Sequence, residues 1–137
     1  MLMMKTNYLE TLPSFLVFFA LALALLAVFT AIYTWITPHK EFALIRAGNT
    51  AAAISFAGAV IGFVVPLASV IAHSLNLVDM LVWGAIAMTA QIAVFLIASR
   101  GMPELPKAIE AGQAAPAATL AAFSLAIGIL NAACMVY

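Results

Sequence analysis

The sequence contains few charged residues. Only 7% of its 137 residues are charged and 67% are hydrophobic, whereas about a quarter of the residues of a soluble domain are charged. Five Lys and Arg balance five Asp and Glu, so no excess of positive charge is present to attract nucleic acid. This composition excludes a soluble enzyme, a nucleic-acid-binding protein and a disordered linker. It predicts a membrane protein with one domain, residues 1–137.

Reactive groups are scarce as well. Cys134 is the only cysteine, which excludes an intramolecular disulfide and a paired-cysteine metal or redox site. The sequence has no Ser-His-Asp or Cys-His arrangement, no phosphate-binding glycine loop and no zinc-protease motif. No ionisable residue lies at mid-depth in an apolar run, where proton-coupled transporters place theirs. We expect no enzyme activity, catalytic residue, cofactor or metal, and we interpret His73 and Asp79 as surface residues at segment ends.

Long apolar runs are abundant. A membrane-spanning helix needs about 20 apolar residues, and runs of this length cover residues 14–36, 50–72, 79–99 and 115–137. The runs do not alternate with polar residues as barrel strands do, so they predict an all-α bundle of four transmembrane helices. We place Pro13 in a first helical turn and Asn49 at a helix cap. The first run is longer than the apolar core of a signal peptide, and we expect it to remain as a spanning helix. Four aromatic residues near segment ends fit an aromatic belt: Tyr33, Trp35, Trp83 and Tyr137.

The positive charges predict an orientation. Lys40 and Arg46 lie in the connection 37–49, and Arg100 and Lys107 lie in the connection 100–114, whereas the opposite side carries Lys5. Because positive residues favour the cytoplasm, we expect both connections to be cytoplasmic and both termini to lie outside. The lipid bilayer is then the main environment of a multi-pass protein.

The chain also contains an internal repeat. Residues 47–53 (AGNTAAA) align with residues 111–117 (AGQAAPA), an offset of 64. Weaker matches lie in the same order on both sides of this segment. Repeat one then covers about 14–72 and repeat two about 79–137, each with two crossings. Two crossings per repeat make the halves parallel, related by an axis along the membrane normal.

The two connections predict short helices at the membrane surface, which we call the first elbow (37–49) and the second elbow (100–114). Thr37 and Pro38 suit a helix start and Gly48 a left-handed stop. The apolar side would rest on the lipid while the charges face water. Each elbow is either a docking surface for a cytoplasmic protein or a simple solvated turn. The residues singled out are Pro38, His39, Lys40, Glu41, Arg46, Gly48, Asn49, Pro103, Glu104, Lys107, Glu110 and Gly112.

Small residues form stripes on the second and fourth runs. Such stripes let helix backbones approach closely in lipid, either within one bundle or between copies in a homo-oligomer. Pro66 leaves the Gly62 carbonyl without its helical donor, and we expect a neighbouring Ser to bind it, the alternative being an ion. The helix-packing residues are Ser55, Gly58, Gly62, Pro66, Ser69, Ser124, Gly128 and Asn131.

Few strongly polar groups lie inside the runs. We expect Gln91 and Asn131 to make structural hydrogen bonds between helices, the alternative being contact with a solute. Thr30 and Thr34 either line an aqueous vestibule or bond to their own helix.

Several segments resemble one known family: ITPHKE at 36–41, AGNTAA at 47–52, GFVVPL at 62–67 and NAACM at 131–135. Together they resemble the YjfL-like proteins, domain-of-unknown-function family 350, over essentially the whole chain. The resemblance implies a bacterial inner-membrane protein with four helices in two repeats, and no catalytic residues. Members are often encoded near phage-shock-type proteins, which implies a role in membrane maintenance.

Two functions follow as hypotheses. The first is a non-enzymatic, self-associating membrane scaffold or accessory protein that presents its elbows to lipid head groups or to a peripheral cytoplasmic protein. The second is a small oligomeric pore or carrier for ions or small solutes, whose path would be lined by Thr30, Thr34, Gln91 and Asn131.

Overall fold

The computed structural model describes residues 8–135. Within them the chain forms helices α1 (Tyr8–Ile36), α2 (Glu41–Arg46), α3 (Thr50–His73), α4 (Leu77–Gly101), α5 (Leu105–Glu110) and α6 (Ala114–Cys134), and no strand. The four long helices are long and apolar enough to cross a membrane, so the predicted all-α fold is confirmed. Lys5, Tyr137 and the predicted helix end at 137 lie outside the described residues.

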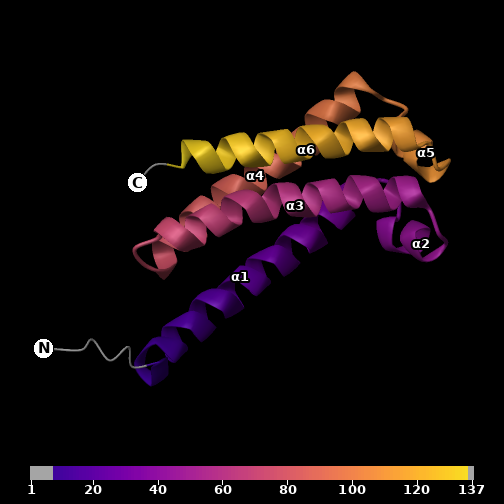
Figure 1. Ribbon diagram of the computed structural model, residues 1–137. Helices are drawn as coiled ribbons and strands as arrows, with labels where there is room; N and C mark the ends of the chain where they lie inside the picture. Colours follow the sequence, from indigo (N-terminus) through magenta and orange to yellow (C-terminus); the bar gives the residue numbers. More distant parts are fainter. Residues whose placement is uncertain (1–7, 136–137) are drawn as a thin grey trace, which may run out of the picture.

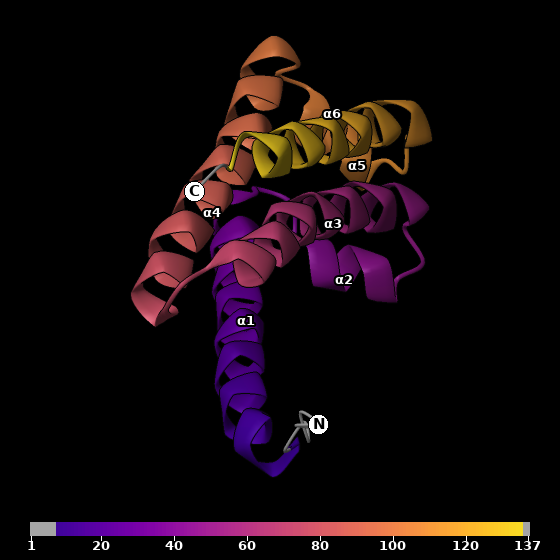
Figure 2. The same ribbon diagram turned by 60° about the vertical axis from the view of Figure 1, so that its left-hand side comes forward.

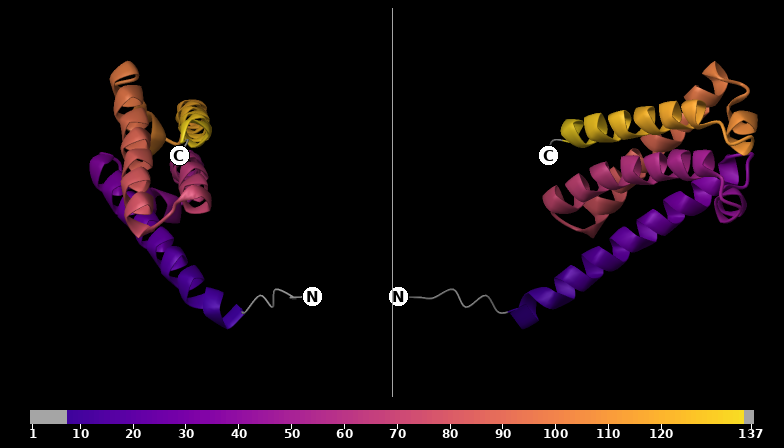
Figure 3. Two further views of the ribbon diagram at one scale, coloured as in Figure 1. Left: turned by 90° about the vertical axis from the view of Figure 1, so that its left-hand side faces the viewer. Right: turned by 45° about the vertical axis from the view of Figure 1, so that its right-hand side comes forward.

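The long helices form two layers. Helices α3 and α6 run side by side in the same direction, and α1 and α4 lie together on the other side of them (Figure 1; Figure 3, left). The short helices α2 and α5 both lie at one end of the bundle, and α1 begins and α6 ends at the other (Figures 1 and 2). The two elbows therefore share one side, as the chain order requires. Which side faces the cytoplasm stays a prediction.

Two helix starts differ from the predicted ones. Pro13 lies inside α1, so its placement in a first turn is wrong; one more turn of helix precedes it, and the proline removes the donor for the carbonyl of Leu9. Helix α4 begins two residues before Asp79 because a reciprocal cap holds its start. Asn76 Oδ1 accepts from the Asp79 amide at 2.8 Å, and Asp79 Oδ2 accepts from the Leu75 amide at 3.2 Å.

The core is aromatic toward the elbow end of α1. Phe29 stacks on Phe63 of α3 with ring centres 4.6 Å apart, and Tyr33 meets the ring of Phe95 from α4 edge-on at 5.6 Å. Tyr33 is buried, so its assignment to the aromatic belt is wrong. It follows Leu25 and Phe29 at helical spacing on the one face of α1 that packs on the bundle. Trp35, on another face, is 84% exposed.

The first half of α1 leaves the bundle (Figures 1 and 2). Only 6% of the most apolar window of α1 is buried, compared with 44% for α3. Large apolar side chains are therefore exposed along this half, among them Leu12, Phe15, Leu16, Phe19 and Leu23.

Candidate functional site

The small residues of α3 and α6 lie in the interface between these two helices. A Cβ added at Gly58 would lie 2.5 Å from the Cα of Ala121, and one added at Gly62 or Gly128 would collide with the backbone of the facing helix. The two backbones are therefore in direct contact, as small-residue stripes permit. The buried members of the predicted packing set are Ser55, Gly58, Gly62, Pro66, Ser124 and Gly128. Within one chain this interface already covers the stripes, so another copy cannot use them without opening the bundle.

Gln91 joins three helices in the centre of the bundle. Its Nε2 donates to the Gly62 carbonyl of α3 at 2.9 Å and to the Ser124 carbonyl of α6 at 3.0 Å. The Gly62 carbonyl has no helical donor because Pro66 lacks an N–H. The side-chain amide thus replaces the missing bond, and the prediction that a serine would do so is wrong.

The expected structural hydrogen bonds between helices are present for Gln91 and absent for Asn131 Nδ2. Gln91 Nε2 is already used by the two carbonyls, and Asn131 Nδ2 has no hydrogen-bond partner within residues 8–135. Near the end of the same stripe, Ser69 Oγ makes a long contact of 3.5 Å with the Ala132 carbonyl. Sequence spacing could not identify the true partners, because both carbonyls belong to the backbone of other helices.

The threonines of α1 bond to their own helix. Thr30 Oγ1 donates to the Leu26 carbonyl at 2.9 Å and Thr34 Oγ1 to the Thr30 carbonyl at 2.8 Å. Such bonds satisfy the hydroxyl without any solvent or solute. The hydroxyls of Thr30 and Thr34 are thus satisfied within α1.

The elbows are braced against each other through Asn49. Its Oδ1 accepts from the Ala52 amide at 3.0 Å and caps α3, as predicted. Its Nδ2 donates to the carbonyls of Ile109 and Glu110 at the end of α5, at 2.8 and 3.2 Å. One side chain therefore links the start of α3 to the second elbow.

The two elbows end in the same kind of turn. Gly48 and Gly112 have φ values of +86° and +79°, the left-handed conformation that favours glycine. In each turn the glycine amide donates a hydrogen bond to the carbonyl three residues earlier. The amide of the next residue donates to the carbonyl five residues earlier. The predicted helix starts differ, however. Thr37 and Pro38 precede α2 rather than beginning it, and Thr37 Oγ1 instead donates to the Thr34 carbonyl.

Exposed residues of both elbows form what we call the elbow face. Phe42 and Ala43 are exposed on α2. A depression of about 400 Å³ lies between α2 and α5, lined by Pro38, Lys40, Ala43, Leu44 and Glu110. The elbow face consists of Lys40, Phe42, Ala43, Arg46, Pro103, Glu104, Lys107 and Glu110.

Two of the elbow charges do not face water. His39 and Glu41 are almost completely buried, so their predicted exposure is wrong. His39 Nε2 lies 3.0 Å from Glu41 Oε1. This pair could not be predicted, because a hydropathy pattern assigns charged residues in a connection to solvent. The one indication in the sequence that Glu41 is buried is its alignment with the apolar Leu105 in the repeat.

At the other end of the bundle, His73 and Asp79 stay at the surface. His73 Nδ1 lies 2.8 Å from the Ser69 carbonyl at the end of α3, and Asp79 belongs to the cap of α4. Each has a local structural partner, so the geometry gives neither a chemical role.

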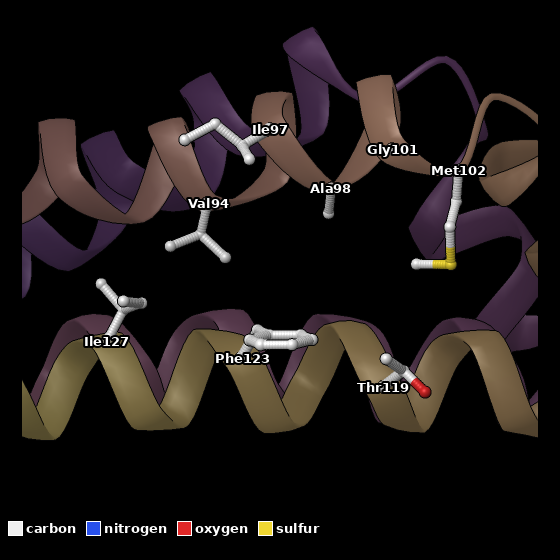
Figure 4. Close-up of a pocket in the computed structure, with 8 residues that line it drawn as sticks. All are labelled: Val94, Ile97, Ala98, Gly101, Met102, Thr119, Phe123 and Ile127. Atoms are coloured by element: carbon white, nitrogen blue, oxygen red, sulfur yellow. The ribbon is translucent and has the colours of Figure 1, made fainter.

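A cleft of about 430 Å³ separates α4 from α6 toward the elbow end. Figure 4 shows the side chains of Val94, Ala98 and Met102 reaching toward Thr119, Phe123 and Ile127. Its one hydroxyl, on Thr119, donates to the Ala115 carbonyl of its own helix at 2.9 Å. The cleft therefore offers apolar surface and no group for chemistry on a polar solute.

Comparison with known proteins agrees with this architecture. The family model described as "Domain of Unknown Function (DUF350)" matches residues 7–135. The "UPF0719 inner membrane protein YjfL" of Escherichia coli strain K12 is 37% identical over 131 residues, 96% of this chain and 99% of the relative. The protein of the same name in Escherichia coli O157:H7 matches equally well. No solved structure matches the chain. The chain belongs to the DUF350 family, whose matching relatives are inner membrane proteins, and its four apolar helices fit a multi-pass protein of that membrane.

Proposed function

We propose that this protein is a non-enzymatic membrane scaffold that holds a peripheral cytoplasmic protein on its elbow face. Membrane maintenance is the role that the family resemblance implies for such a scaffold. The proposal is supported by the distribution of polar groups. Inside the bundle, the hydroxyls of Thr30 and Thr34 and the amide nitrogen of Gln91 bond to backbone carbonyls. Most of the exposed charges of the described residues lie on the elbows.

The bracing of the elbows by Asn49 carries the proposal. A connection that only turns the chain back needs no bond to another connection. Asn49 nevertheless fixes the end of α5 to the start of α3 through two hydrogen bonds. A docking surface gains affinity from being rigid before the partner arrives, because less conformational entropy is lost on binding.

The elbow face suits a protein partner. It combines the half-exposed ring of Phe42, a depression between two helices and charges of both signs. An aromatic anchor surrounded by polar groups is typical of protein interfaces. A purely lipid-binding surface would instead be dominated by Lys and Arg, and here Glu104 and Glu110 are exposed beside Lys107.

Site-specific photo-crosslinking in bacterial membranes tests the proposal. A photoreactive amino acid at Phe42 should give a discrete adduct with a cytoplasmic protein. The same amino acid at Ile61, an exposed apolar position inside α3, should react with lipid and serves as the control. Reversing two charges of the elbow face, Arg46→Glu with Lys107→Glu, should weaken the adduct several-fold. Adducts with lipid alone at Phe42, or the same protein adduct at Ile61, would contradict it.

The pore or carrier alternative receives less support from the geometry. Thr30 and Thr34 are bonded to α1, and Gln91 is bonded to the carbonyls of Gly62 and Ser124. The two hydroxyls and the Gln91 amide nitrogen are therefore occupied by backbone carbonyls. Among the four candidate residues, the buried Gln91 Oε1 and Asn131 Nδ2 lack a hydrogen-bond partner within the described residues.

Self-association, if it accompanies the scaffold role, needs a surface other than the small-residue stripes. We propose the exposed first half of α1. Leu12, Leu16, Phe19 and Leu23 follow one another at steps of four, three and four residues and are each about half exposed. This spacing places them in a single seam.

A further inference from the structure

A cluster of polar side chains lies between the end of α1 and the start of α2. His39 occupies the turn before α2, and Glu41 is the first residue of α2. Their side chains are fully buried, and His39 Nε2 lies 3.0 Å from Glu41 Oε1. Phe95 of α4 meets the rings of both His39 and Tyr33 edge-on. Tyr33, His39 and Glu41 are thus gathered at one corner of the bundle.

The polar atoms at this corner lack hydrogen-bond partners. Both ring nitrogens of His39, both carboxylate oxygens of Glu41 and the hydroxyl of Tyr33 are buried, and none has a hydrogen-bond partner within the described residues. The 3.0 Å approach of His39 to Glu41 therefore lacks the angles of a hydrogen bond. Leaving one buried polar group unpaired costs about 1–3 kcal/mol, and such groups in proteins are usually satisfied by water or an ion when the chain does not satisfy them.

Packing alone does not require charged residues here. With the repeat offset of 64, Glu41 at the start of α2 corresponds to Leu105 at the start of α5, and both are buried. A leucine therefore fills the equivalent place in the other elbow. Since a buried ion pair is often no more stable than apolar residues of similar volume, the pair in the first elbow calls for a chemical role.

We propose that Tyr33, His39 and Glu41 form a binding site for one divalent first-row transition metal ion such as Zn²⁺. Imidazole nitrogen together with carboxylate and phenol oxygen suits these ions, whereas Ca²⁺ and Mg²⁺ take oxygen ligands. Two ligand atoms that each lie about 2.0–2.2 Å from one ion stand roughly 3 Å apart, which is the separation observed between His39 and Glu41. Residues 8–135 hold no group of three or more His, Cys, Asp and Glu that could bind a metal. The proposed site therefore requires Tyr33, whose buried hydroxyl has no hydrogen-bond partner within the described residues, as its third protein ligand.

Metal binding at this corner would fasten α2 to α1. Tyr33 belongs to α1, His39 to the turn and Glu41 to α2, so one ion would bridge all three segments and set the position of the elbow face. The site does not depend on the proposed function, because metal content can be measured whether or not a partner binds.

Metal analysis of the purified protein tests the site. Because the pair is sealed from solvent, the ion enters while the chain folds, and cells are grown with added Zn²⁺. The protein carries no histidine tag, and zinc is counted by mass spectrometry against a detergent blank. We expect about one zinc per chain in the wild type and in the control His73→Gln, and less than a tenth of that in Glu41→Leu and His39→Gln. No zinc above the blank in the wild type, or full zinc in Glu41→Leu, overturns the proposal.

A measurement on the wild type alone covers the case in which the variants do not fold. Protein from cells grown with Co²⁺ instead of Zn²⁺ should show visible absorption bands of a low-coordinate cobalt site with nitrogen and oxygen ligands. An excess of Ca²⁺ or Mg²⁺ in the same growth medium, present while the chain folds, should not diminish the bands. Their absence, or their loss to Ca²⁺, overturns the proposal.

Discussion

At the scale of single residues, the bundle is held by polar groups that bond to backbone. Gln91 Nε2 donates a hydrogen bond to the Gly62 carbonyl, which lacks a helical donor because Pro66 has no N–H. It also donates to the Ser124 carbonyl. The sequence could predict that Gly62 has a free carbonyl, because the rule for proline is local. It could not predict the partner, because the contact joins helices that are distant in the chain.

Replacing Gln91 tests this junction. Gln91→Met keeps the volume but removes both hydrogen bonds and leaves the Gly62 carbonyl unpaired. Hydrogen bonds between membrane helices contribute about 0.6 kcal/mol on average, with a ceiling near 2, so we expect the free energy of unfolding to fall by about 1–3 kcal/mol. Reversible unfolding in mixed detergent micelles measures it. Thr89→Val, which removes a hydroxyl that bonds within α4, should change stability by less than about 0.5 kcal/mol; equal effects of the two changes would contradict the assigned role.

The buried acid of the first elbow marks the limit of sequence-based prediction at this scale. A glutamate between Lys40 and Phe42 has every local reason to face water. Its burial follows from the packing of α2 at the corner where α1, α2 and α4 meet, which no periodicity within residues 37–49 reveals. The alignment of Glu41 with Leu105 is visible in the sequence, and it would have indicated a buried position once the helix starts were known.

At the scale of elements, the turns were more predictable than the short helices. The left-handed glycines and the Asn49 cap follow from local chemistry and occur as predicted. The start of α2 was misplaced at Thr37 and Pro38, because a capping residue followed by proline is a typical helix start. In the structure that segment is instead the bend that carries His39 inward.

The brace between the elbows gives a prediction with an internal control. Asn49→Ala removes the cap of α3, worth about 0.5–2 kcal/mol, and both bonds to the end of α5. We therefore expect the free energy of unfolding to fall by about 1–3 kcal/mol and amide exchange at 105–112 to accelerate. Gln113 occupies the equivalent position before α6 and makes no side-chain cap bond, so Gln113→Ala should have almost no effect.

Asn49→Asp separates the two roles of this side chain. Aspartate still accepts from the Ala52 amide but cannot donate to the carbonyls of α5. Stability should recover toward the wild-type value while exchange at 105–112 stays fast. Slow exchange in Asn49→Asp would show that Asn49 does not brace the second elbow.

At the scale of the whole molecule, the two antiparallel pairs, α1–α3 and α4–α6, are packed unequally (Figure 1). In α4, 33% of the most apolar window is buried, compared with 6% in α1, whose first half leaves the bundle (Figure 3). The sequence predicted the helices, their order and the common side of the elbows. It could not predict the departure of α1, because its uniformly apolar residues suit lipid and helix contacts equally well.

Disulfide crosslinking between copies tests whether the exposed seam of α1 mediates self-association. In a Cys134→Ser background, single cysteines at Leu12, Leu16, Phe19 and Leu23 should form dimers on oxidation in native membranes, because these residues share one face. Val17 lies on the same exposed segment but off the seam, and Leu130 is exposed on α6; cysteines there should crosslink several-fold less. Dimers at Leu130 and Val17 as strong as those on the seam would indicate random collision. Dimers at none of the six positions would place any self-association elsewhere, and the scaffold would then act through the elbow face of single copies.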